Sequence, residues 1–503
     1  MADALVQGFL LLLTPESLFM ITAGIIIGLF LGVIPGLGGL ATLALLTPLV
    51  YGMEPVPALA LVLAAYSSVY FGGSVSAILL NTPGTGEQVV TTFDGYPMTQ
   101  QKKGARALGI SATASALGGI FGVLIVFVTL PFMRQLVMYF ASPEVFALGL
   151  LGVFVMGIVG AGSVSKGILS GLLGMLVAFV GYDPVTGIPR LTFGNLMLFD
   201  GLGITAITMG LFAVSEMISL FVKGRAVAGT TDYSFSNEKG HRLWDGVLDC
   251  FIHWRTTLRG GIVGAAAGII PGMGGTVAMF FSYGLAKQVS KTPELFGKGA
   301  PEGVVAAESS NNAKEGGSLV PTLALGIPGT SGMALFMGIL LILGFTPGPG
   351  MLTEHLDIVF VMSWAIILGS IFASIIGLGL TPLLVKASYL RPELLAPLII
   401  SISLLGSFLE QRMLLGVVLA IVTGFIGYLF KIMNYSNAGI TLGFMLGPII
   451  EKNLFQALQA YGPTMIFRPL TLVIFLTGLY LIISPYISRK RMQKKRVAEG
   501  GIL

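Results

Sequence analysis

Long apolar runs recur along almost the whole chain, and they restrict its fold more than any other feature. Runs of this kind cover residues 117–130, 146–160, 359–376 and 470–483 with their flanks. A helix needs about 20 apolar residues to cross the roughly 30 Å of hydrocarbon in a bilayer. Only 10% of the 503 residues are charged, against about 25% in soluble domains. We therefore predict an all-α polytopic membrane protein with about ten to twelve helical segments.

Several short motifs occur twice in the chain, in the same order. Because this order is kept along each half, we interpret it as a duplication that produced two homologous halves. The main pairs are Gly32-Val-Ile-Pro-Gly-Leu-Gly-Gly39 with Gly268-Ile-Ile-Pro-Gly-Met-Gly-Gly275, Gly72-Gly-Ser74 with Gly316-Gly-Ser318, Pro83-Gly-Thr85 with Pro328-Gly-Thr330, and Thr192-Phe-Gly194 with Thr441-Leu-Gly443.

The duplication sets the domain boundaries that we predict. The first transmembrane repeat covers 18–222 and the second covers 255–486, with a polar linker at 223–254 and a basic tail at 487–503. Duplicated halves in secondary transporters often have opposite orientations and enclose a substrate site near the bilayer midplane. We predict inverted repeats; parallel repeats, with an even number of crossings in each half, are the alternative.

The basic residues are distributed unevenly along the chain. No Lys or Arg precedes Lys102, whereas six of them lie between Arg489 and Arg496. By the positive-inside rule, this tail and the C-terminus are cytoplasmic. We interpret the tail as a topological signal rather than a nucleic-acid site.

Two features interrupt the apolar segments at corresponding places in both halves. The first is Pro35-Gly-Leu-Gly-Gly39, with its counterpart Pro271-Gly-Met-Gly-Gly275. The second is the polar, Gly-rich stretch 66–86, with its counterpart 308–331. Proline removes a backbone donor, and glycine tolerates conformations that other residues resist. We therefore expect interrupted or re-entrant helices near the midplane, with unwound backbone in these stretches.

Breaks of this kind favour a site for a small polar or anionic solute. The N-terminus of a half-helix presents free N–H groups and a positive dipole end to a carboxylate, and freed carbonyls can hold Na⁺. We predict a candidate Na⁺ site at the backbone carbonyls near Gly72, Gly73, Gly316 and Gly317. The candidate substrate-binding residues are Gly36, Gly38, Ser74, Asn81, Thr82, Gly84, Thr85, Gly272, Gly274, Asn311, Asn312, Ser318, Pro328, Gly329, Thr330 and Ser331.

Several residues have a simpler structural interpretation. A single Gly-Gly-Ser or Pro-Gly-Thr motif is usually a turn between helices, and only its recurrence in both halves favours a site. Lys314 and Glu315 either belong to a site or have a structural role, as an internal ion pair or in a water-exposed loop, and the sequence favours neither interpretation. The segment 94–106 is expected to be a loop that leads into a helix, and Cys250 a buried, unreactive thiol.

Enzyme motifs are missing from the sequence. It has no Walker A motif, no His-Glu-x-x-His and no convincing Gly-x-Ser-x-Gly elbow, and its three histidines are too scattered for a metal centre. We expect no enzymatic activity and no cofactor apart from a coupling ion, Na⁺ or H⁺.

The ordered motifs of both halves resemble one family over nearly the whole chain. The sequence is similar to the large membrane subunit, TctA, of the tripartite tricarboxylate transporters. The motifs that carry the resemblance are Pro35-Gly-Leu-Gly-Gly39, Asn81-Thr-Pro-Gly-Thr-Gly-Glu87, Phe93-Asp-Gly-Tyr-Pro97, Ile270-Pro-Gly-Met-Gly-Gly275, Glu308-Ser-Ser-Asn-Asn312 and Gly326-Ile-Pro-Gly-Thr330.

The resemblance implies a secondary active importer in a bacterial inner membrane. Such an importer takes up citrate or a related carboxylate, is driven by a cation gradient, and works with a small TctB-like membrane subunit and a periplasmic TctC-like solute-binding protein. We expect an elevator-like movement of the interrupted segments, with rocking of the halves as the alternative. A channel or a membrane scaffold subunit without coupled transport is the competing function.

Overall fold

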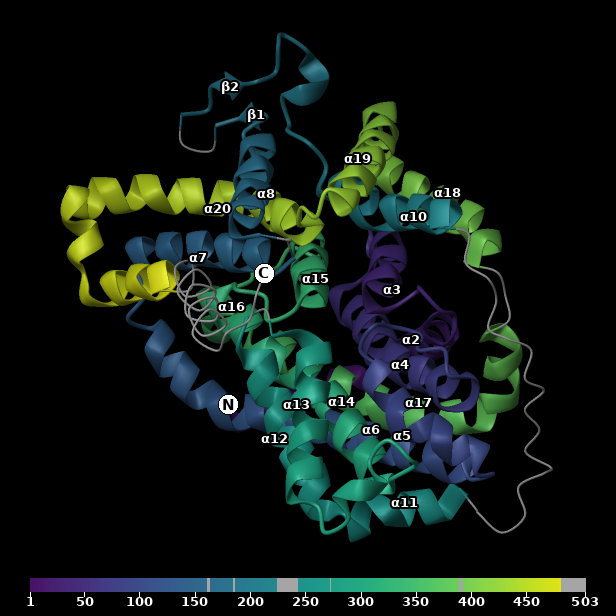
Figure 1. Ribbon diagram of the computed structural model, residues 1–503. Helices are drawn as coiled ribbons and strands as arrows, with labels where there is room; N and C mark the ends of the chain where they lie inside the picture. The colour runs from purple at the N-terminus through teal and green to yellow at the C-terminus, as the bar shows by residue number, and fades with distance from the viewer. Residues whose placement is uncertain (161–162, 184–185, 224–242, 272, 389–391, 481–503) are drawn as a thin grey trace, which may run out of the picture. The chain divides into compact units, whose positions relative to one another are not determined.

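Most of the residues that the structure describes lie in helices. The computed structural model describes residues 1–503 except 161–162, 184–185, 224–242, 272, 389–391 and 481–503 (Figure 1). Within that described part the strands are β1 (Gly181–Tyr182) and β2 (Pro189–Arg190), a short antiparallel pair. The predicted all-α polytopic membrane fold is confirmed.

Two of the predicted interruptions lie between helices that precede residues 224–242. They are α1 (Ala2–Leu12), α2 (Pro15–Val33), α3 (Gly39–Leu46), η1 (Thr47–Val50), α4 (Pro55–Leu80), α5 (Val89–Gln100), α6 (Gly104–Val137), α7 (Ser142–Gly160), α8 (Val164–Ala178), η2 (Leu196–Leu198), α9 (Ile204–Thr208), η3 (Met209–Val214) and α10 (Ser215–Lys223).

The other two predicted interruptions lie between helices that follow residues 224–242. They are α11 (Leu243–Ile252), α12 (Trp254–Ile269), α13 (Gly274–Val289), η5 (Pro293–Leu295), α14 (Pro301–Leu325), α15 (Ser331–Ile342), α16 (Pro349–Thr353), α17 (Leu356–Ser388), α18 (Pro392–Gln411), α19 (Leu414–Ile432), α20 (Asn437–Tyr461) and η6 (Gly462–Phe467). A last helix covers Pro469–Tyr480.

The lengths of these helices explain why spans are hard to count from hydropathy. Among the described residues, five helices are long and apolar enough to cross a membrane, or six if the bent pair Asn437–Phe467 and Pro469–Tyr480 is one span. Other apolar helices, such as α3 and α15, are shorter because they begin at a break. Helix α14 is long enough, but it carries buried charges.

Four breaks lie where the duplicated motifs predicted them. Helix α2 ends at Val33 before α3, and α12 ends at Ile269 before α13. The second pair of breaks lies at 81–88, between α4 and α5, and at 326–330, between α14 and α15. The expected unwinding is wrong in one respect: α4 and α14 continue through the Gly-Gly pairs, and the chain leaves the helix only afterwards. Re-entry into the membrane and inversion of the halves stay predictions.

Glycines let corresponding helices of the two halves pack in the same way. A β-carbon at Gly32 would lie 2.0 Å from the Val69 carbonyl oxygen, and one at Gly268 would lie 2.2 Å from that of Lys314. Such close backbone approach is what small residues permit between membrane helices. Val69 therefore corresponds to Lys314 in the structure. The sequence pairing of Gly72 with Gly316 would instead match Val69 to the residue before it, Ala313. The polar residues before the two Gly-Gly pairs obscure this shift in the sequence.

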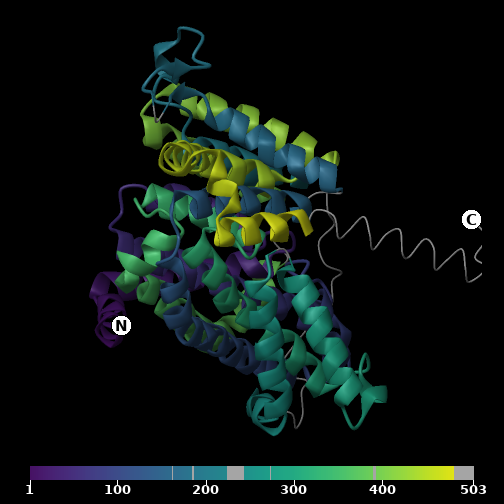
Figure 2. The same ribbon diagram turned by 90° about the vertical axis from the view of Figure 1, so that its left-hand side faces the viewer.

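The chain forms two compact units. Unit 1 comprises 1–137, 203–324 and 328–428, and unit 2 comprises 138–202, 325–327 and 429–503. This division differs from the two sequence repeats, because each repeat contributes to both units. In unit 1, α12 and α13 pack side by side, as the teal helices of Figure 1 and Figure 2 show. In unit 2, α20 packs against α7 and α8.

Two partly buried ion pairs link segments of unit 2. The Glu144 carboxylate is fully buried and accepts hydrogen bonds from Arg468 Nε at 2.8 Å and Thr471 Oγ1 at 2.7 Å. Arg190 donates two bonds to Glu451, at 2.6 and 2.9 Å. Bidentate pairs of this kind fix geometry as well as charge.

Cys250 is buried on α11, as expected. Burial raises the pKa of its thiol to about 12. Because the thiolate is the reactive form, this cysteine is an inert packing residue.

The segment around Asp94 is a helix, which corrects the predicted loop: α5 covers Val89–Gln100, and only 101–103 separate it from α6. The buried Asp94 carboxylate accepts hydrogen bonds at 2.8 Å from the backbone N–H groups of Gly297, Gly299 and Ala300. Tyr283 on α13 donates a further one at 2.9 Å. Asp94 therefore fastens α5 to α13 and to the loop before α14.

Replacing Asp94 with alanine is expected to destabilise unit 1. The change leaves three backbone donors without their acceptor, and each bond to a buried charge contributes about 1.5–3 kcal/mol. We expect a loss of roughly 3 kcal/mol or more, measured as a lower unfolding temperature in detergent. The exposed Glu294 in the same loop supplies the control. Equal unfolding temperatures for Asp94→Ala and Glu294→Ala would contradict the prediction.

Candidate functional site

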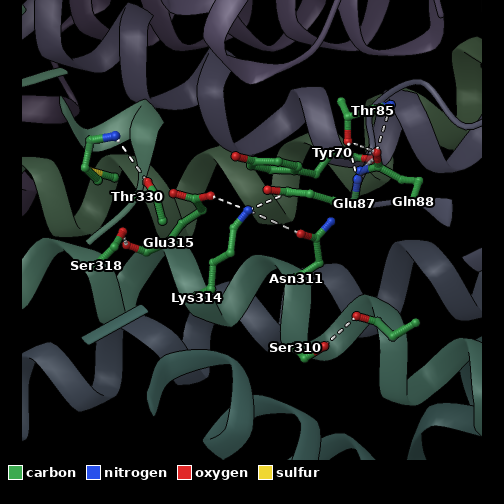
Figure 3. Close-up of polar contacts among 12 residues, drawn as sticks. Tyr70, Thr85, Glu87, Gln88, Ser310, Asn311, Lys314, Glu315, Ser318 and Thr330 are labelled. Carbon is green, nitrogen blue, oxygen red and sulfur yellow. Dashed lines mark hydrogen bonds and ion pairs between the residues drawn. The ribbon is translucent and has the colours of Figure 1, made fainter. Parts of the chain in front are cut away.

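A buried lysine forms the centre of the candidate site. The Lys314 side chain on α14 is 1% exposed, and its Nζ lies 2.5 Å from Glu87 Oε2 and 2.9 Å from Glu315 Oε1 (Figure 3). Nζ also lies 4.2 Å from the centroid of the Tyr70 ring. A charge removed from water is costly unless it is paired. The two carboxylates and the ring face provide this pairing.

Both halves of the chain supply these side chains. Tyr70 comes from α4 and Glu87 from the break between α4 and α5, whereas Lys314 and Glu315 come from α14. The start of helix α13 also packs against the lysine, because a β-carbon at Gly275 would lie only 2.4 Å from Lys314 Nζ. We refer to Tyr70, Glu87, Asn311, Lys314 and Glu315 as the Lys314 cluster.

The cluster is chemically asymmetric. With Val69 matched to Lys314, the aromatic residues Tyr66 and Tyr70 of α4 occupy the positions of Asn311 and Glu315 of α14. The two tyrosine rings pack edge to face, with centroids 5.6 Å apart. Helix α4 therefore contributes aromatic surface, and helix α14 contributes amide, ammonium and carboxylate groups. An asymmetric solute requires such a difference.

Unused polar groups lie within and next to the cluster. Asn311 accepts a 3.5 Å contact from Lys314 Nζ through Oδ1, while its Nδ2 has no hydrogen-bond partner among the described residues. Asn312 Oδ1 and Thr82 Oγ1 are buried without a partner in the same described part. Such groups are rare in native proteins and call for an explanation. A bound solute that accepts from Asn311 beside Lys314 would provide one.

The charged side chains of the cluster differ in exposure. The Glu87 side chain is 22% exposed, against 1% for Lys314 and Glu315. Glu87 is therefore the part of this ion-pair group that lies nearest the surface.

The start of α15 lies close to the aromatic side of this region. Thr330 caps the helix, because its Oγ1 accepts from the Met333 N–H at 3.2 Å. A β-carbon at Gly332 would overlap the Tyr66 hydroxyl, at 1.9 Å. In the first half, Thr85 Oγ1 donates to Gln88 Oε1 just before α5. The two second breaks therefore both place a threonine at the entry to a helix.

The break residues that were predicted as substrate ligands mostly build the breaks. Gly36 and Gly274 have positive φ, and Asn81 is the left-handed C-cap of α4. The glycines of the two Pro-Gly-Thr motifs pack on the preceding breaks, since a β-carbon at Gly84 would lie 2.0 Å from the Gly32 carbonyl oxygen and one at Gly329 would lie 2.3 Å from that of Gly268. Gly38 is the N-cap of α3, and Pro328 and Ser331 flank the cap of α15. Gly272 lies outside the described residues.

The two predicted serines have different surroundings. Ser318 donates to the Glu315 backbone carbonyl at 2.8 Å, whereas Ser74 donates to the carboxylate of Glu308. The Gly72, Gly73, Gly316 and Gly317 carbonyls lie within continuous helices, where carbonyls accept intrahelical bonds. They are therefore poorer ion ligands than unwound carbonyls.

Sequence reasoning left Glu87, Glu308 and the two tyrosines out of the site. Glu87 and Glu308 stood within the recognised motifs, but nothing local showed that they meet residues of the other half. The charges inside an otherwise membrane-length α14 were the available signal.

Comparison with known proteins assigns the chain to a family. The model of the tripartite tricarboxylate transporter TctA family matches residues 18–442, which includes all four breaks and the Lys314 cluster. The chain belongs to the TctA family. It is thus a multi-pass component of a tripartite tricarboxylate transporter, which is not an enzyme class, and the resemblance of its motifs is confirmed.

Two relatives of this TctA-family chain come from Agrobacterium vitis. One, described as an uncharacterized 52.8 kDa protein in the TAR-I ttuC' 3'region, is 32% identical over 493 residues, 97% of each chain. The other, an uncharacterized protein in the TAR-II ttuC' 3'region, is 34% identical over 236 residues, which is 46% of this chain and 98% of the relative. No solved structure matches the chain.

Proposed function

We propose that the chain is the translocating subunit of a secondary active importer that takes up a carboxylate, citrate or a related organic anion. The importer resides in a bacterial inner membrane with the C-terminus of this chain in the cytoplasm. It receives substrate from a TctC-like periplasmic binding protein, requires a small TctB-like membrane subunit, and is driven by a Na⁺ or H⁺ gradient. Family membership and the buried, asymmetric Lys314 cluster support this proposal.

The single observation that carries it is the ammonium group of Lys314, held at the meeting point of the two halves. An incoming carboxylate takes the place of Glu87 at Nζ and accepts a hydrogen bond from Asn311 Nδ2. Charge-assisted bonds of this kind are about twice as strong as neutral ones. The tyrosine rings then cover the apolar part of the solute.

The mechanism follows from the breaks. Displacing Glu87 frees the loop between α4 and α5, which contributes to one side of the site. Unit 1 contains the breaks of both halves apart from 325–327, so the interrupted segments belong to one compact body. Because one compact body holds the interrupted segments, it could move as a whole, and this favours an elevator-like exchange of access over rocking of one half against the other.

The decisive experiment is uptake of radiolabelled citrate and other carboxylates into proteoliposomes that contain this chain and its small subunit. We expect accumulation only with the cognate binding protein and an ion gradient. A Na⁺ gradient at constant pH and a pH gradient without Na⁺ separate the two coupling ions. Flux that does not saturate and needs no gradient would identify a channel. Absence of flux for every carboxylate under both gradients would leave a scaffold role and overturn the proposal.

A further inference from the structure

Glu308 is a buried carboxylate that has no counter-charge among the residues described by the structure. It lies on α14, and no Lys, Arg or His of the described part of the chain comes within ion-pair distance of it. An unpaired charge buried inside a protein is expensive and is kept where it has a use. The Lys314 cluster does not use it, because Lys314 is paired with Glu87 and Glu315.

Hydroxyl groups surround this carboxylate. Ser74 Oγ from α4 lies 2.8 and 2.9 Å from its two oxygens, Ser115 Oγ from α6 lies 3.1 Å from Oε2, and Thr91 Oγ1 from α5 donates to Oε1. The Ser111 hydroxyl interacts with the same carboxyl and is fully buried, but it forms no hydrogen bond within the described residues. Helices α4, α5 and α6 therefore converge on the single charge that α14 carries.

From this arrangement we infer that Glu308 and its hydroxyl cage bind Na⁺, and that this ion is the coupling ion of the proposed importer. Every polar atom offered by these five side chains is an oxygen, which is the donor type that hard cations prefer. The single carboxylate matches one positive charge. Ser and Thr hydroxyls can rotate to present a lone pair to an ion instead of a proton to the carboxylate. The unsatisfied Ser111 hydroxyl supplies a ligand that the ion-free cage does not use.

The position of the cage explains how it would couple to substrate. Glu308 and Lys314 share α14 and lie six positions apart, about 9 Å along the helix axis. Thr91 belongs to α5, the helix that begins just after Glu87. Binding of Na⁺ would fix α5 against α14 and so define the position of the loop that closes over Lys314. A cation here also offsets part of the charge of an anionic cargo.

The inference rests on the proposed function for its role, but its test does not. Na⁺ binding to the purified protein is measured by calorimetry and by the rise in unfolding temperature, with NaCl compared against choline chloride and without any substrate. We expect saturable Na⁺ binding by the native chain and at least a tenfold weaker affinity in Glu308→Gln. The matched control is Glu302→Gln, because Glu302 lies on the same helix and also accepts from two hydroxyls, Thr256 and Ser290.

Two variants that keep the Glu308 carboxylate show whether weaker Na⁺ binding is caused by misfolding. Ser74→Ala and Ser115→Ala each remove one oxygen, and we expect each to weaken Na⁺ binding several-fold without loss of the folded protein. Native Na⁺ affinity in all three cage variants would overturn the inference. So would a native chain that binds no Na⁺ yet drives carboxylate uptake with a pH gradient, a result that leaves the proposed importer intact and makes Glu308 a proton site.

Discussion

Lys314→Met is expected to lower carboxylate uptake by at least about 100-fold, mainly because the variant lacks the ammonium group that binds the substrate. A 100-fold loss corresponds to about 2.7 kcal/mol, which is within the range measured for a buried charged partner. Uptake into proteoliposomes at matched protein density is the measurement. The exposed Lys291 provides the control, because Lys291→Met removes the same charge outside the cluster.

A second variant separates transport from folding. Removing Lys314 alone leaves Glu87 and Glu315 facing each other without a cation, and breaking a buried pair in this way costs about 3–5 kcal/mol. The double variant Lys314→Met with Glu87→Gln removes one of those carboxylates as well. We expect it to recover much of the lost unfolding temperature and none of the uptake. Recovery of uptake in the double variant would show that Lys314 serves only to neutralise Glu87.

The second large effect concerns Gly84 and Gly329, through which the second break of each half packs closely against the helix before the first break. Gly84→Ala is expected to destabilise the chain by about 3 kcal/mol or more, the upper part of the range for overpacking. The reason is that the added carbon would lie 2.0 Å from the Gly32 carbonyl oxygen and 2.6 Å from the Gly73 α-carbon, and backbone atoms cannot rotate away. Gly329→Ala meets the Gly268 carbonyl oxygen in the same way.

Gly86 makes the comparison sharp. It lies two residues after Gly84 in the same break, and a β-carbon there has no atom within 4 Å. We therefore expect Gly86→Ala to fold and transport like the native chain, whereas Gly84→Ala and Gly329→Ala lose monodisperse protein on size-exclusion chromatography. Native behaviour of Gly84→Ala would show that the two breaks of a half are not packed as the structure has them.

The breaks could be predicted from the sequence because proline and glycine act locally. Pro35 and Pro271 remove a donor wherever they stand, and their recurrence in both halves gave the position of the first break in each half. The extent of the second break was misjudged, since the stretch before Gly316 is polar and was expected to unwind. It stays helical because its side chains find partners: Lys314 bonds Glu87, and Glu308 is surrounded by hydroxyls.

The identity of the site was harder to predict. Glu87 and Lys314 are 227 positions apart, and no local pattern relates them. Asn311 was predicted because its residue type suits a polar solute, and the structure places it beside Lys314. Thr82 and Asn312 keep buried polar atoms without partners in the described region, while their role as ligands stays a prediction.

The asymmetry between Tyr66 and Tyr70 on one helix and Asn311 and Glu315 on the other has an evolutionary consequence. An ancestor made of two identical halves would have presented the same side chains twice, so it could have matched only a cargo with equal ends. In one fused chain α4 and α14 are free to differ, and here α4 carries the aromatic rings and α14 the ionic groups. We therefore expect that changes confined to one of the two helices can alter the preferred cargo, and directed evolution of selectivity should begin with a library restricted to α14.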